Sequence, residues 1–120
     1  MEKEMVLSYD PEGDLLEIIF DEALHRTEQK AYQLRDGLML FTTTDSMKPV
    51  QLTIVNYLKL AKLPVFQFNG WNRLKPNDRK KLLHLLNSPM LSSIVKFDPK
   101  TGYGHLASPR LLEMFSAAVR

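Results

Sequence analysis

The chain of 120 residues contains no cysteine, and this absence excludes several kinds of chemistry at once. Without cysteine there is no disulfide framework, no zinc site built on thiolates and no cysteine nucleophile. Long apolar runs are missing as well. Nothing approaches the ~20 residues that a membrane-spanning helix needs, and no signal-type apolar segment follows the charged residues 1–4. We therefore expect a cytoplasmic protein without a membrane span.

The familiar catalytic motifs are also missing. The sequence contains no nucleophile elbow, no phosphate-binding loop and no metal-ligand spacing. His25, His84 and His105 are far apart, and no neighbouring nucleophile or orienting carboxylate can be assigned to any of them. We therefore predict no catalytic residue, no metal site and no cofactor, and the sequence favours a non-catalytic protein.

The composition is that of an ordinary globular protein, with 44% hydrophobic and 25% charged residues. A chain of this length fits a single domain over residues 1–120, with a β-rich front half (1–62) and a mostly helical back half (63–120). The charge is divided unevenly. Residues 1–46 hold eleven acids and four bases, a net charge of −7, whereas residues 47–120 hold three acids and twelve bases, a net charge of +9. This asymmetry fits a basic face for an acidic partner or nucleic acid, or simply two differently decorated halves of one domain.

The clearest pattern in the front half is a hairpin over residues 5–20. Its two β-favouring runs flank the turn cluster Asp10-Pro11-Glu12-Gly13-Asp14, in which Pro11 presets φ and Gly13 supplies a positive φ. The three carboxylates of this cluster do not match a calcium loop, so we expect them to form the turn. Residues 15–20 are apolar on both faces except at Glu17, which predicts a central strand.

A second hairpin is predicted over residues 30–44, because Asp36-Gly37 is a type I′ turn signal between two β-favouring runs. The alternating residues 50–55 add a fifth strand. The sequence therefore predicts an α+β fold, in which an antiparallel β-meander of about five strands is followed by two or three helices packed on one face.

The opening stretch resembles a known family. The run Tyr9-Asp10-Pro11-Glu12-Gly13-Asp14-Leu15-Leu16-Glu17-Ile18 is similar to the start of the domain of unknown function 2283 family of small bacterial proteins. Asp36-Gly37 and the strand over residues 50–54 resemble its later glycine turn and closing strand, so the resemblance covers about residues 5–60. It implies a bacterial protein with a meandering antiparallel sheet and no established activity. Some relatives look like antitoxin-type partners of small toxins.

In the back half, Pro76 and Asp78 predict the start of a helix that runs to about Asn87. Residues 91–106 fit two structures, namely a short helix over 90–95 followed by a turn, or a hairpin of residues 94–97 and 103–106. We expect the helix and the turn. Ser108-Pro109 repeats the helix-start signature and predicts a terminal helix.

Two groups of residues are candidate binding sites. Basic side chains beside the predicted helix would give salt-sensitive contacts with nucleic acid or with an acidic partner: Arg73, Lys75, Arg79, Lys80 and Lys81. The last three spread over roughly 200° of a helix, so a solvated helix shoulder is the simpler explanation. The aromatic segment 63–71 either packs over the sheet or lines a small-ligand pocket with three side chains: Trp71, Tyr103 and His105.

The sequence thus predicts a non-catalytic protein-interaction or regulatory module. One alternative is nucleic-acid binding through the basic back half, and a second is a small-ligand binder or enzyme with a pocket near Trp71. Because an open strand edge or a Met- and Leu-rich helix can pair with another copy, we also predict a homodimer.

Overall fold

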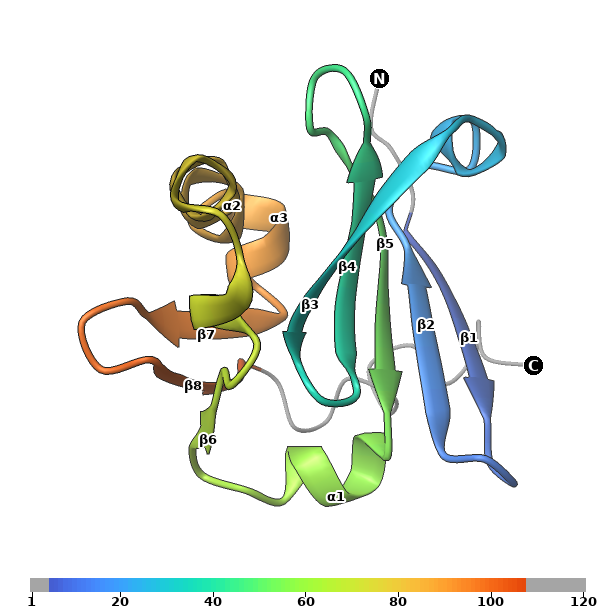
Figure 1. Cartoon of the computed structure of the whole chain (residues 1–120). Helices are drawn as coiled ribbons and strands as arrows, with labels where there is room; N and C mark the ends of the chain where they lie inside the picture. The colour runs from blue at the N-terminus through green and yellow to red at the C-terminus, as the bar shows by residue number, and fades with distance from the viewer. Residues whose placement is uncertain (1–4, 108–120) are drawn as a thin grey trace.

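The computed structural model describes residues 5–107 of the chain, and its largest part is a five-stranded antiparallel sheet (Figure 1). The strands are β1 (Val6–Asp10), β2 (Leu15–Ile19), β3 (Gln29–Arg35), β4 (Leu38–Thr43) and β5 (Pro49–Val55). They lie in the order β1-β2-β5-β4-β3 across the sheet. The predicted α+β class with five antiparallel strands is confirmed, and so is the interior position of the second strand.

The order of the strands differs from the predicted meander at one place. β3, β4 and β5 are consecutive neighbours, but β2 pairs with β5 and not with β3. This register places Leu16 opposite Ile54 and Ile18 opposite Leu52, and all four side chains are fully buried. The connection over residues 20–28, which includes the short 3-10 helix η1 (Leu24–Arg26), carries the chain across to β3.

The physical reason for this order lies in the side chains of β3. Lys30, Ala31 and Gln33 are exposed, as is usual for a strand at the edge of a sheet. Strand β5 is apolar on its core side, with Val50, Leu52 and Ile54 buried. A central strand such as β2 therefore gains more buried apolar surface beside β5 than beside β3.

The second half of the chain combines short helices with a second sheet of three strands, ordered β6-β8-β7 (Figure 1). The helical segments are α1 (Tyr57–Ala61), η2 (Trp71–Arg73), α2 (Pro76–Leu86) and α3 (Pro89–Ser92), and the strands are β6 (Phe66–Gln67), β7 (Val95–Asp98) and β8 (Tyr103–Leu106). The second sheet is an element that the sequence analysis does not predict for the back half, and it stands beside the predicted helices.

Residues 91–106 form the hairpin and not the helix and turn that we expected. A helix does begin at Ser88-Pro89, but this helix, α3, ends after one turn at Ser92. Val95 and Leu106 then face each other across the hairpin and are both buried, which a helix over 90–95 would not allow. Gly102 closes the turn with φ +79°, and its N–H donates to the Asp98 carbonyl oxygen at 2.9 Å. The predicted terminal helix lies outside the described residues.

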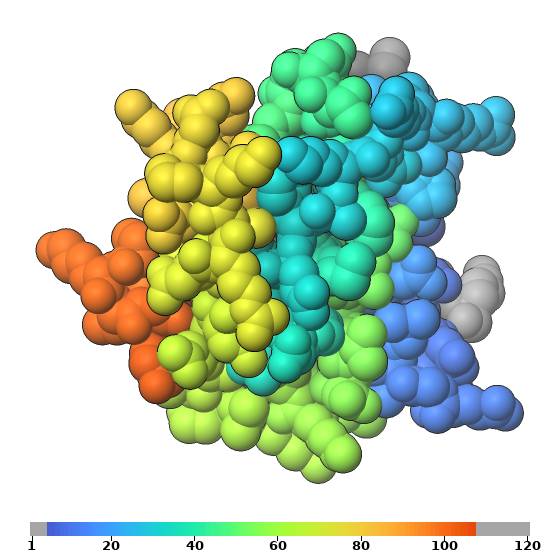
Figure 2. Space-filling view, in the orientation of Figure 1, coloured from blue at the N-terminus to red at the C-terminus, as the bar shows by residue number. Residues whose placement is uncertain are grey.

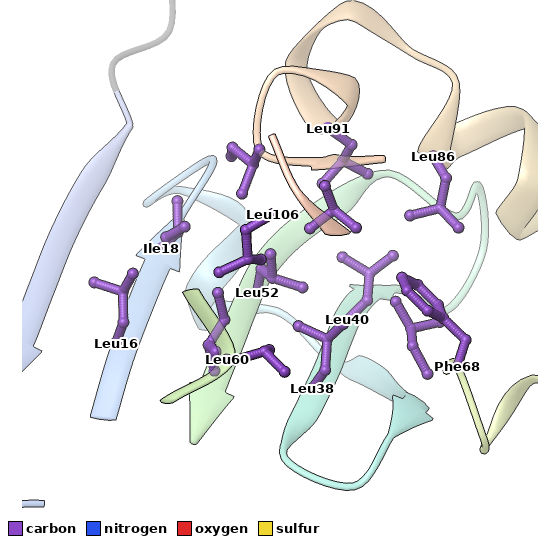
Figure 3. Close-up of a cluster of buried hydrophobic side chains, with 14 of the residues drawn as sticks. Leu16, Ile18, Leu38, Leu40, Leu52, Leu60, Phe68, Leu86, Leu91 and Leu106 are labelled. Carbon is purple, nitrogen blue, oxygen red and sulfur yellow. The ribbon is translucent and has the colours of Figure 1, made fainter. Parts of the chain in front are cut away.

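One face of the five-stranded sheet forms the floor of the hydrophobic core (Figure 3). The sheet contributes these buried side chains to it: Leu16, Ile18, Leu38, Leu40 and Leu52. They are covered by residues from the second half of the chain: Leu60, Phe68, Leu86, Leu91 and Leu106. Full burial of one such side chain contributes about 1.5–3 kcal/mol, so this contact between the two halves is the main source of stability.

The opening turn has a structural role that explains its residues. Asp14, and not Gly13 as predicted, takes the positive φ (50°). The Asp14 carboxylate accepts hydrogen bonds from the Tyr9 hydroxyl at 2.8 Å and from the Leu58 N–H at 3.0 Å. It therefore occupies the start of α1 and ties the first hairpin to that helix. The Asp10 carboxylate accepts from the Glu12 N–H at 3.1 Å, so these acids form the turn as expected.

Two glycines mark places where neighbouring backbones nearly touch, one between the two halves of the chain and one within the second sheet. A Cβ on Gly70 would lie 2.2 Å from the Gln33 carbonyl oxygen of β3. A Cβ on Gly104 would lie 2.1 Å from the Lys96 carbonyl oxygen and 2.8 Å from the Phe68 ring. Only glycine fits at these positions without moving a strand.

Alanine at Gly70 or at Gly104 is expected to lower the free energy of unfolding by about 2–4 kcal/mol, because the backbone must move to admit the methyl group. Urea denaturation of each variant measures this loss. Gly13→Ala is the matched control, since its Cβ would meet only the exposed Asp10 side chain and no backbone atom. An equal loss in all three variants would contradict the close-packing explanation.

The bond between Tyr9 and Asp14 predicts a pH dependence of stability. The hydrogen bond to Asp14, aided by partial burial, raises the pKa of Tyr9 above its ordinary value of 10.0. A pKa that is higher in the folded than in the unfolded state stabilises the protein below the unfolded pKa, and this contribution is lost as pH rises through the folded pKa. Tyr9→Phe should therefore lose stability less steeply than the parent between about pH 9 and about pH 11. Urea denaturation across this pH range measures the free energy of unfolding of the parent and of Tyr9→Phe. If it fell equally with pH in both proteins, the Tyr9–Asp14 hydrogen bond would not contribute to stability.

Candidate functional site

An open groove lies between α2 and the loop that joins β4 to β5, which are neighbours at the upper edge of Figure 2 (yellow and green). We call it the α2 groove. Its volume is about 700 Å³, and it is lined by these residues: Asp45, Ser46, Met47, Asn77, Lys80, Lys81, His84 and Leu85. This size is in the range of sites for small molecules and short peptide segments.

The spacing of residues along α2 explains why one side of the helix lines the groove. Pro76 begins the helix and Asp78 lies in its first turn, as the sequence predicted. Leu82 and Leu86 point into the core. The groove residues of α2 recur three and four positions apart, at 77, 80, 81, 84 and 85, and so lie on one side of the helix.

The structure divides the predicted basic cluster. Lys80 and Lys81 line the α2 groove, and both are exposed. Arg79 lies about 160° from Lys81 around the helix, on the other side. Arg73 belongs to η2, and Lys75 is the residue before α2. Two of the five predicted residues thus meet in the groove, and three do not line it.

The opposite wall of the groove is a tight loop. Met47 has a positive φ (51°), and the Lys48 N–H donates to the Thr43 hydroxyl at 3.0 Å. The Asp45 carboxylate accepts from the Ser46 N–H at 2.6 Å and from the Ser46 hydroxyl at 3.2 Å. The N–H of Ser46, followed by the hydroxyls of Ser46 and Thr43, lowers the pKa of Asp45. Asp45 therefore stays ionised at neutral pH and places one fixed negative charge in the groove.

The groove combines two kinds of surface. Two ammonium groups, on Lys80 and Lys81, outnumber the one carboxylate, on Asp45. Met47 and Leu85 are only partly buried and add an apolar surface between these charges. Methionine side chains adapt to the shape of what they contact. The arrangement suits a ligand with negative charges close to an apolar side chain.

The predicted aromatic pocket is not assembled as one site. Trp71 is 8% exposed and packs on Phe97, with ring centroids 4.7 Å apart. Phe97 in turn packs on Phe68 at 4.4 Å, so this side of the second sheet is an aromatic cluster. Tyr103 and His105 are exposed on β8 and line a different depression from the one that Trp71 borders.

Sequence reasoning missed most of the groove. His84 was noted only as an isolated histidine, although its spacing from Lys80 and Lys81 already placed it on their side of a helix. Nothing in the sequence marked Asp45, Ser46 and Met47 as part of a binding site, because the approach of their loop to α2 is a tertiary contact. Over residues 5–107, no three metal-ligating side chains come together as a metal site.

Comparison of the chain with protein-family models, with curated proteins and with solved structures finds no match. The resemblance to the domain of unknown function 2283 family therefore stays a prediction. No helix in the described part of the chain has the length and apolar character needed to cross a lipid bilayer.

The geometry of the β4–β5 loop predicts a measurable shift. Ser46→Ala removes the hydroxyl donor to Asp45 but keeps the backbone N–H, so the pKa of Asp45 should rise part of the way toward its ordinary value. Side-chain carboxyl NMR over an acid titration measures this pKa in both proteins. Ser92→Ala, whose hydroxyl donates to a carbonyl oxygen elsewhere, is the control. If the pKa of Asp45 were the same in Ser46→Ala as in the parent protein, the Ser46 hydroxyl would not be a cause of the lowered pKa.

Proposed function

We propose that the protein is a non-catalytic binding module that holds an acidic peptide segment of a partner protein in the α2 groove. The observation that carries the proposal is the presence of two lysines and an apolar wall in one groove. A segment with acidic residues on both sides of an apolar one would place carboxylates near Lys80 and Lys81. Its apolar side chain would cover Met47 and Leu85.

The same groove supports nucleic acid less well. A phosphate backbone needs a continuous track of positive charge. Here Arg79 lies on the other side of α2, and the ionised Asp45 interrupts the groove. The Lys30 ammonium is 3.7 Å from the Asp78 carboxylate, so this neighbouring positive charge is already partly neutralised. A short peptide tolerates such a mixed surface, because its charges are few and separated.

The predicted homodimer, the cytoplasmic location and the family resemblance stay predictions beside this proposal. An antitoxin-type role would be one biological setting for a module of this kind, since the resemblance implies it for some relatives. The proposed binding itself depends only on the groove and can be tested without knowing the partner.

The test uses a fluorescent pentapeptide with a leucine between two pairs of glutamates, together with random-sequence duplex DNA and single-stranded RNA as competing probes. We expect the peptide to bind in low salt and to shift the amide NMR signals of the β4–β5 loop and α2. The double variant Lys80→Glu/Lys81→Glu should weaken binding at least about tenfold, because two attractive charges become repulsive.

The matched control is Lys96→Glu/Lys100→Glu, which reverses two exposed lysines on the β7–β8 hairpin, outside the groove. It should weaken binding by less than about twofold. Equal losses in both double variants would show that only net charge matters and would refute the groove. Tighter binding of DNA or RNA than of the peptide, or no binding of any probe, would refute the acidic-peptide proposal.

A further inference from the structure

A buried glutamine on β5 holds a histidine of the η1 connection in place. The Gln51 side chain is 7% exposed. Its amide nitrogen donates to the Glu17 carboxylate and to the Thr53 hydroxyl, both at 2.9 Å, and its oxygen lies 2.7 Å from Nε2 of His25. Both polar atoms of this amide thus form hydrogen bonds, and one of these bonds is with His25, which is itself exposed.

This network determines which nitrogen of His25 carries the proton. A carboxylate only accepts hydrogen bonds, so Glu17 must face the nitrogen of the Gln51 amide and not its oxygen. The Gln51 oxygen then has to accept, and Nε2 of His25 has to donate. In the neutral imidazole, Nδ1 is therefore the nitrogen with a lone pair for a ligand.

The backbone of the connection is anchored on both sides of the histidine. The Asp21 carboxylate accepts from the Ala23 N–H at 3.0 Å and from the Leu24 N–H at 3.3 Å. On the other side, the Gln29 amide donates to the His25 carbonyl oxygen at 2.8 Å. His25 is thus held by its ring and by its main chain, although the loop is on the surface.

The anchored histidine borders a depression of about 610 Å³ that contains two further charges. Its lining is made of Ile19, Glu22, Ala23, His25 and Arg26. Within residues 5–107, the side chains of Glu22 and Arg26 have neither an ion-pair nor a hydrogen-bond partner. Arg26, Glu22 and His25 therefore border one depression without pairing with one another.

We propose that this depression binds a zwitterionic α-amino acid with an aliphatic side chain. Arg26 would bind the carboxylate, Glu22 and Nδ1 of His25 would accept from the ammonium group, and Ile19 and Ala23 would contact the side chain. A simple anion would leave Glu22 unneutralised, and a simple cation would leave Arg26 unneutralised. Only a ligand with both charges matches all three polar groups. The inference concerns a different surface from the α2 groove and does not depend on it.

The test is an NMR titration of the isotope-labelled full chain with L-leucine, acetate and methylamine. L-leucine should shift the amide signals of residues 19–26 in a saturable way, and acetate and methylamine should not. His25→Ala, Arg26→Met and Glu22→Gln should each weaken L-leucine binding at least about fivefold. Arg73→Met and Glu12→Gln are the matched controls, since both side chains are exposed elsewhere on the molecule, and they should leave it unchanged.

Three results would overturn the proposal. The first is binding of acetate or methylamine as tight as that of L-leucine, which would indicate a site for a single charge. The second is an unchanged affinity in Arg26→Met or Glu22→Gln. The third is the lack of any saturable shift with L-leucine at about pH 8. None of these results bears on the peptide titration of the α2 groove, so the two proposals can fail separately.

Discussion

The structure depends on the need to cover one face of the five-stranded sheet. Leu16, Ile18, Leu40 and Leu52 all project from that face and are fully buried. The second half of the chain supplies the cover from α2, α3 and β8 (Figure 3). This requirement fixes how α2 is rotated, because its leucines must point inward. The same rotation turns Lys80, Lys81 and His84 toward the β4–β5 loop, so the groove is a consequence of core packing.

The parts of the fold that could be predicted are those encoded by neighbouring residues. The hairpin turn forms at Asp36-Gly37 as predicted, and Gly37 has φ +83°. It is not the predicted type I′ turn, because Asp36 lacks the positive φ that this type requires at its first central residue. The pairing of β2 with β5 could not be predicted this way, since it joins segments that are distant in sequence. Residues 91–106 show the competition directly. Ser88-Pro89 begins a helix, but burial of Val95 and Leu106 opposite each other ends it after one turn.

The candidate sites also divide into features encoded by neighbouring residues, which could be predicted, and contacts between distant segments, which could not. The basic residue types and their helical spacing indicated Lys80 and Lys81, but the wall formed by Asp45 and Met47 is tertiary and was missed. Trp71 follows the first of the two alternatives that the sequence left open, since its ring packs on Phe97. The β4–β5 loop also has a second neighbour, because the η1 connection borders its other side. One short loop thus separates the surface proposed for a peptide from the connection proposed to hold an amino acid.

The place of β5 in the sheet has a consequence for how the protein is made. On the ribosome, β1 and β2 emerge before the other strands of this sheet, but the partner for the free edge of β2 is the last of these strands to be synthesised. Until then the nascent hairpin has an exposed apolar strand edge, with which other chains can pair. Closure of the sheet also requires a long loop to form, which slows folding. The edge of β2 is thus exposed until β5 has been synthesised and pairs with it.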